Sequence, residues 1–163
     1  MLGKEVFMIE ARKIVIPKEA EKEITFMLFN YLNIDNLIEK RKKDLIENVN
    51  ISNNAWLKSL NESANTLEDV VIKFDNDKTI LKLKRWKLLI NSFNSRLYDN
   101  ENPVYYWLIR LKYMDKVEDN TLLEKLDIDK EELKNLDIYL KWKLYCLAVE
   151  RNLFDGGEVN VWM

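Results

Sequence analysis

The sequence has no histidine, the side chain that most often acts as a general base near neutral pH. This excludes a serine–histidine triad and removes the imidazole ligands common in zinc sites. No glycine-rich phosphate loop occurs, because Gly156 and Gly157 follow the last predicted helix instead of opening one. Carboxylates are numerous but scattered over amphipathic segments, as on a solvated surface. We therefore expect a protein that is not an enzyme, with no cofactor and no metal.

Helix-breaking residues are also scarce, with 3 Gly and 2 Pro among 163 residues. A β-sandwich or barrel needs many turns, so this scarcity favours long helices. The length suffices for one well-buried core, and we expect an all-α, single helical domain of five to seven helices. Its predicted parts are a helical amino-terminal part over 1–98 with a lead-in at 1–17, a helix-turn-helix part over 99–154, and a tail over 155–163.

Cysteine is nearly absent as well, and the single Cys146 cannot form an internal disulfide. It lies within an apolar helical pattern, so we expect it to be a small buried hydrophobe in a reducing cytoplasm. No run approaches about 20 apolar residues, which predicts no membrane span. Charged residues interrupt the amino end, where a signal peptide would be apolar. The expected location is cytoplasmic.

Apolar residues recur at helical spacing over 18–33, 36–49, 78–98 and 104–114. The strongest stripe is Leu83, Trp86, Ile90, Phe93 and Leu97. Steps of three and four favour packing into the core of this chain, while a coiled-coil seam, and hence a homodimer, is the alternative. Residues 70–84 admit either a β-hairpin or a helix interrupted near Asp77. We favour the helix, because an isolated hairpin is marginally stable.

Residues 119–140 have the spacing of two short helices that share a core across a tight turn. The apolar positions are Leu122, Leu123, Leu126, Ile128, Leu133 and Leu136. Asp127 stands where such a turn requires a positive φ, which Asp tolerates. Asp129 is expected to cap the second helix, with Glu132 completing a capping box. This pattern predicts a helix-turn-helix and makes DNA binding the first functional hypothesis.

Three segments resemble the last conserved region of bacterial sigma factors. They are Asn102-Pro-Val-Tyr-Tyr-Trp-Leu-Ile-Arg-Leu-Lys-Tyr-Met114, Thr121-Leu-Leu-Glu-Lys-Leu-Asp-Ile-Asp129, and Leu144-Tyr-Cys-Leu-Ala148. In the first, Asn102 is the expected N-cap and Pro103 the first helical residue. The wider layout resembles phage regulators of the RinA and ArpU type, which carry a sigma-like, region-4-like helix-turn-helix. The resemblance implies a phage-type transcription regulator that binds promoter DNA, host RNA polymerase, or both.

Two sets of residues are the candidate DNA contacts. Facing the major groove from the second helix we expect Lys130, Lys134, Asn135 and Lys141. Holding phosphates from the helix over 78–98 we expect Lys82, Lys84, Arg85 and Lys87.

Charge opposes this hypothesis in one respect. Through residue 98 the chain has 17 Lys and Arg against 14 Asp and Glu, but from residue 99 it has 9 against 14. The predicted helix-turn-helix thus lies in an acidic half, and Asp137 is expected on the exposed face of its second helix, where it would repel phosphate. The alternative function is a small helical phage-encoded protein that binds and inhibits a host protein, such as a nucleic-acid-binding machine, through this acidic half and without DNA.

Overall fold

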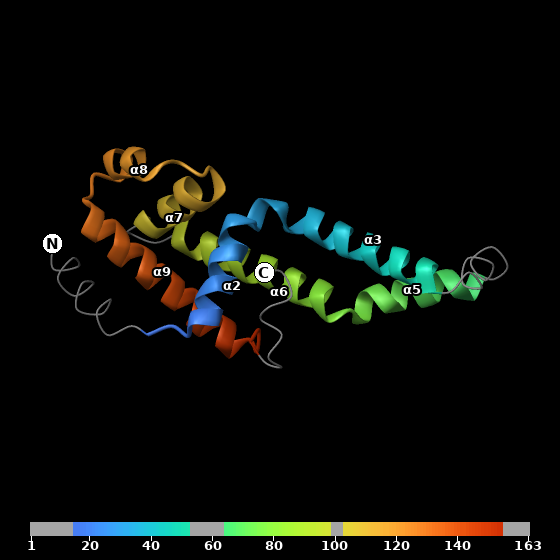
Figure 1. Cartoon of the computed structure of the whole chain (residues 1–163). Coiled ribbons are helices and arrows are strands. Elements are labelled where there is room, and N and C mark those ends of the chain that lie inside the picture. The colour runs from blue at the N-terminus through green and yellow to red at the C-terminus, as the bar shows by residue number, and fades with distance from the viewer. Residues whose placement is uncertain (1–14, 53–63, 99–102, 155–163) are drawn as a thin grey trace. The chain divides into compact units, whose positions relative to one another are not determined.

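The computed structural model describes residues 15–52, 64–98 and 103–154 (Figure 1). Within these ranges it contains seven α-helices and no strand, which confirms the predicted all-α class of five to seven helices. Residues 15–17 are irregular, as predicted for the lead-in. The rest of the lead-in, the predicted cap Asn102 and the tail over 155–163 lie outside the described residues. No helix in the described ranges is both long and apolar enough to cross a membrane.

The described helices group into two compact units. One unit combines residues 1–32 with 86–163, and the other comprises residues 33–85. The first unit therefore joins residues from both sides of the boundary predicted at residue 98. The dividing point at residue 85 falls inside a continuous helix, α6 (Lys78–Tyr98).

The first unit is built around two long helices, α2 (Lys18–Phe29) and α9 (Lys130–Glu150), which pack on each other. Helix α7 (Val104–Leu108) continues into a π-helix, η2 (Ile109–Met114), and α8 (Asp119–Leu126) follows. In Figure 1, α7 lies beside α9, and α8 lies over the segment that follows α7. Fully buried side chains from α2, α6, η2 and α9 form the core; they include Ile24, Met27, Trp86, Ile109 and Leu144.

The stripe of α6 contributes four residues to this core, Trp86, Ile90, Phe93 and Leu97, while its Leu83 belongs to the second unit. Its five predicted residues are all buried within the chain, which confirms the core interpretation of the pattern.

Two details of the first unit differ from expectation. Pro103 is the N-cap of α7 and not its first helical residue, and its carbonyl accepts from Trp107 N at 3.1 Å. Cys146 is exposed, because it lies two residues from the buried Leu144 and Ala148, which places it on the other side of the helix.

The second unit contains α3 (Ile34–Ser52), α5 (Ala64–Asn76) and the first turns of α6. Residues 70–84 are helical with a single break at Asp77, so the preferred helix is confirmed and the hairpin is wrong. The break before α3 comes earlier than predicted. Helix α2 ends at Phe29, a 3-10 turn, η1 (Tyr31–Asn33), follows, and α3 begins at Ile34.

Asp77 joins α3 to the break between α5 and α6. Its carboxylate accepts from Arg41 Nε at 3.2 Å and Nη2 at 3.0 Å, and caps α6 by accepting from Ile80 N at 3.0 Å. Burial works to raise the pKa of Asp77, but the hydrogen bonds from Arg41 and Ile80, together with the Arg41 charge, outweigh it and lower that pKa. A carboxyl whose folded-state pKa is lowered stabilises the fold above its unfolded-state pKa, and this stabilisation is lost as the pH falls through the folded-state value.

Replacing Asp77 by Asn is therefore expected to lower the free energy of unfolding by about 2 kcal/mol at pH 7, the scale of hydrogen bonds to charged groups. Asn keeps a capping oxygen, so the change tests the charge and not the cap. The difference should shrink as the pH falls below about 4 and the Asp77 carboxyl of the wild type is protonated. Urea unfolding followed by circular dichroism at a series of pH values measures it. Asp75→Asn, an exposed neighbour, is the control, and equal effects of the two changes would contradict the prediction.

Candidate functional site

The connection between α8 and α9 has the local features that the sequence predicts. Asp127 ends α8 in the left-handed region with φ 53° and ψ 53°. Asp129 caps α9, and its Oδ1 accepts from Glu132 N at 2.8 Å. Ile128 between them is half-buried, and its backbone N donates to Leu123 O at 3.1 Å. The turn residue and the cap are thus confirmed, and three residues separate α8 from α9.

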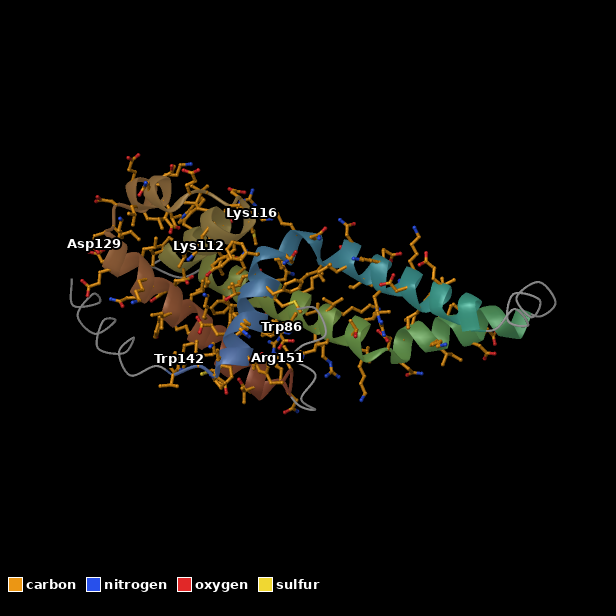
Figure 2. The ribbon with its side chains drawn as sticks, viewed as in Figure 1. Trp86, Lys112, Lys116, Asp129, Trp142 and Arg151 are labelled. Carbon is orange, nitrogen blue, oxygen red and sulfur yellow. The ribbon has the colours of Figure 1, made fainter. Side chains whose placement is uncertain are left out.

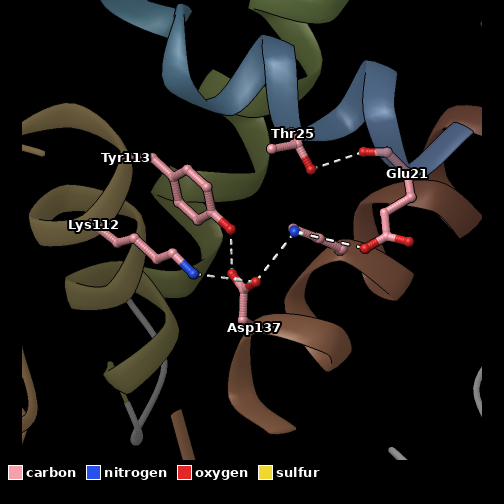
Figure 3. A network of polar contacts seen from close by, with 6 residues as sticks. Glu21, Thr25, Lys112, Tyr113 and Asp137 are labelled. Atoms are coloured by element: carbon pink, nitrogen blue, oxygen red, sulfur yellow. Dashed lines mark hydrogen bonds and ion pairs between the residues drawn. The ribbon is translucent and has the colours of Figure 1, made fainter. Parts of the chain in front are cut away.

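Asp137 differs from expectation, because it is buried and not on an exposed face of α9. Tyr113 Oη donates a hydrogen bond to its Oδ1. Lys112 Nζ lies 3.3 Å and Lys141 Nζ 3.2 Å from its Oδ2. Lys141 Nζ also lies 3.9 Å from Glu21 Oε1 on α2, so the network links three elements of the first unit (Figure 3). We call these five residues the Asp137 network.

The π-helix η2 brings two consecutive residues of this network to one carboxylate. Asp115 N donates to Arg110 O at 2.9 Å, a bond that spans five residues in place of the four of an α-helix. In this wider turn both Lys112 and Tyr113 reach Asp137. Burial and then the neighbouring Asp137 charge raise the pKa of Tyr113, so its hydroxyl stays protonated and remains a donor.

A cleft of about 470 Å³ opens beside the Asp137 network. Its lining comprises three amino groups, two carboxylates, one amide and one apolar side chain: Lys112, Lys130, Lys134, Asp119, Asp137, Asn120 and Leu133. These residues come from η2 and from the first turns of α8 and α9. Figure 2 labels Lys112, which lines the cleft, and Asp129, which directly precedes the lining residue Lys130. The cleft is the place where chemistry-bearing side chains of the first unit converge.

The predicted DNA contacts of α9 divide into two groups. Lys130 and Lys134 are exposed and line the cleft together, and Asn135 is half-buried. Lys141 does not face outward, because its side chain is only 12% exposed and pairs with Asp137 one helical turn earlier. The predicted arrangement is therefore corrected at Lys141, which belongs to the Asp137 network.

The predicted phosphate contacts of α6 lie at the division between the two units. Lys82, Lys84 and Arg85 belong to the second unit and Lys87 to the first. Lys84 and Arg85 are exposed, while Lys82 and Lys87 are half-buried and each has an interaction of its own. Lys84 and Arg85 are thus the accessible members of this set.

Among the described residues of the carboxy-terminal half, positive and negative charges nearly balance. Residues 103–154 contain nine Lys and Arg against ten Asp and Glu, a net charge of −1. The other four carboxylates counted from residue 99 are outside the described ranges: Asp99, Glu101, Asp155 and Glu158.

Sequence reasoning missed the roles of Lys112, Asp119 and Asn120 in the cleft. Lys112 lies in an aromatic helical segment, and nothing within that segment indicates a contact with Asp137 on α9. Asp119 and Asn120 did carry a signal, since they begin the stretch over 119–140 that predicts the helix-turn-helix, although they lie in α8 itself and not before it. Among the described residues no group of three His, Cys, Asp or Glu side chains is arranged to hold a metal ion.

No protein-family model matches the chain, and neither does any curated protein or solved structure. The fold defines the class of the protein as all-α. Its function is therefore argued from the geometry of the cleft and of the helices that form it.

Proposed function

We propose that the protein is a non-enzymatic transcription regulator of the phage type that binds promoter DNA, host RNA polymerase, or both. The observation that carries the proposal is the pair Lys130 and Lys134, exposed on the first turns of α9 directly after a tight, capped turn. A helix that begins in this way presents its amino-terminal residues to base edges when it lies in the major groove. The resemblance to the sigma-like regulators agrees with this use of α9.

Burial of Asp137 supports the proposal further. The main electrostatic objection to DNA binding is the number of carboxylates on the second helix. Asp137 is withdrawn from that face and compensated by two lysines, which leaves Asp129 and Glu131 as the exposed carboxylates next to Lys130 in the sequence. Each lysine that neutralises a phosphate releases counterions, so the remaining positive charges favour association with DNA at low salt.

Fluorescence anisotropy with promoter-proximal DNA of the protein's own operon tests the proposal. We expect binding at roughly micromolar protein in low salt, with an affinity that falls steeply as salt is added. The double variant Lys130→Glu with Lys134→Glu is expected to weaken binding by about tenfold or more, because two contacts become repulsive. Lys116→Glu with Lys125→Glu is the matched control, since both residues are exposed in the same unit and outside the cleft.

The same assay separates the two sets of contacts. Lys84→Glu with Arg85→Glu is expected to abolish DNA binding if α6 holds phosphates, and normal binding by this variant would remove α6 from the interface. A control pair that weakens binding as strongly as Lys130→Glu with Lys134→Glu would show an effect of net charge alone. No binding of the wild type at low salt would reject the DNA function.

A second candidate, a protein that binds a host protein without DNA, is favoured by an exposed aromatic row in the first unit. Tyr98 is 63% and Trp107 44% exposed, and both rings contact Tyr106 edge-on at centroid distances of 4.9 and 5.1 Å. Tyr and Trp are enriched in protein interfaces, where they bury large areas at low entropic cost. Binding of host RNA polymerase by this row is compatible with the proposed regulator, whereas partner binding without any DNA affinity identifies the second candidate.

A further inference from the structure

The cleft beside α9 is lined by three lysines and two aspartates, a net charge of +1. Lys130 and Lys134 are exposed and, within the described residues, enter no ion pair. Lys112, which pairs with Asp137, supplies a third amino group from η2. Amino groups from two different elements that line one cleft can bind the same anion.

The Asp137 carboxylate in the lining of the cleft is shared between two lysines, Lys112 and Lys141. It already accepts from Tyr113 and pairs with Lys112 and Lys141, so its lone pairs are largely occupied. The group that opposes an anion is Asp119, which is exposed and lies at the first position of α8. There it faces the positive end of the helix dipole, a position that an anionic ligand would share.

Two helix amino-termini border the cleft. Asp119 and Asn120 are the first residues of α8, and Lys130 is the first residue of α9. At the start of α8 the Glu118 side chain makes no capping hydrogen bond, so backbone N–H groups of the first turn are left for another acceptor. Lysines and helix amino-termini together are a recurrent way of binding phosphate.

We propose that this cleft is a phosphate-binding site in which Lys112, Lys130 and Lys134 surround the oxyanion and the amino-terminus of α8 donates to it. The phosphate is either a diester of a nucleic-acid backbone or a free phosphate or phosphomonoester. A cleft of about 470 Å³ is larger than a phosphate group and leaves room for the molecule attached to it. The inference rests on the proposed function only if the phosphate belongs to a nucleic-acid backbone. It adds Lys112 to the DNA contacts that the sequence predicts.

Amide chemical shifts of the full chain test the inference. Inorganic phosphate is titrated against chloride at constant ionic strength, and saturable shifts are expected at Asp119, Asn120 and Lys130. Lys134→Gln is expected to weaken the phosphate affinity by about tenfold, the effect of losing one charge-assisted contact. Asp119→Asn is expected to strengthen it by about threefold, since a nearby like charge is removed. Lys125→Gln, on an exposed part of α8 outside the cleft, should leave the affinity unchanged.

The expected rise in phosphate affinity of Asp119→Asn cannot come from a misfolded variant, because an unfolded chain does not gain affinity. Two further ligands identify the source: glycerol phosphate, and a duplex that carries methylphosphonates in place of its phosphodiesters, compared with the unmodified duplex. Saturable shifts with phosphate or glycerol phosphate support the site with a free ligand. Shifts with the unmodified duplex but not with its neutral analogue support the site with a backbone ligand.

The inference is overturned if neither inorganic phosphate, nor the monoester, nor the unmodified duplex shifts the three amides. It is also overturned if the two duplexes shift them equally, since phosphate charge is then irrelevant. Failure of the proposed function is distinct: phosphate still shifts the amides, but DNA gives no anisotropy change. Conversely, if the two duplexes bind equally well through Lys130 and Lys134, DNA binding stands and the phosphate site does not.

Discussion

Replacing Asp137 with alanine is expected to lower the free energy of unfolding by about 3 kcal/mol, the scale for removing one partner of a buried charge pair. The change leaves Lys112 without its carboxylate and Tyr113 without its acceptor. Lys141 retains only Glu21, at 3.9 Å, while its side chain stays largely buried. The loss is measured by urea unfolding at pH 7, followed by circular dichroism.

Glu131→Ala is the matched control for this prediction. Glu131 is an exposed carboxylate on the first turn of the same helix, so its removal should change the free energy of unfolding by no more than about 0.5 kcal/mol. If the two variants lose stability equally, the Asp137 network contributes nothing specific and the carboxylate is solvated in the native state. Tyr113→Phe should lie between them, at about 1 kcal/mol, because it removes one hydrogen bond and keeps the ring packed.

The network also shows where sequence reasoning stops. The left-handed Asp127 and the Asp129 cap follow from interactions within a few residues, and both are predictable from the sequence. The burial of Asp137 depends on Tyr113, which is 24 residues away and reaches it from a π-helix. No periodicity in the sequence signals that wider turn, so Asp137 was placed on the exposed face with the other polar residues of α9.

Helix α9 illustrates the same limit in another way. Apolar and aromatic residues occur around most of its circumference, so the pattern does not define a single buried face. Cys146 is therefore exposed although its neighbours Leu144 and Ala148 are buried. In α6 the stripe is regular over the whole helix, and there both the bounds and the buried positions agree with the prediction. Regular spacing, and not apolar content, decides how much of the core can be predicted.

The second large effect is expected at the centre of that stripe. Trp86→Ala should lower the free energy of unfolding by about 4 kcal/mol, because Trp86 is fully buried and the change leaves a large cavity. Its ring contacts Phe154 edge-on at a centroid distance of 5.8 Å, which ties α6 to the segment after α9. Trp86→Phe should cost less than about 1.5 kcal/mol, since the buried Nε1 of Trp86 has no hydrogen-bond partner to lose within the described residues.

Leu88→Ala is the control for Trp86, because Leu88 lies on the same helix and is 66% exposed, so its loss should be near zero. The measurement also checks in solution that the stripe packs within its own chain and not in a coiled coil. If α6 packs within its own chain, the urea midpoint of each protein, wild type or Trp86→Ala, does not change when the protein concentration is raised tenfold. A dimer held together by this stripe would unfold at a higher midpoint in the more concentrated sample, because association stabilises the folded state by mass action. A concentration-dependent midpoint, or a Trp86→Ala loss no larger than that of Leu88→Ala, would therefore contradict the assignment of Trp86 to the core.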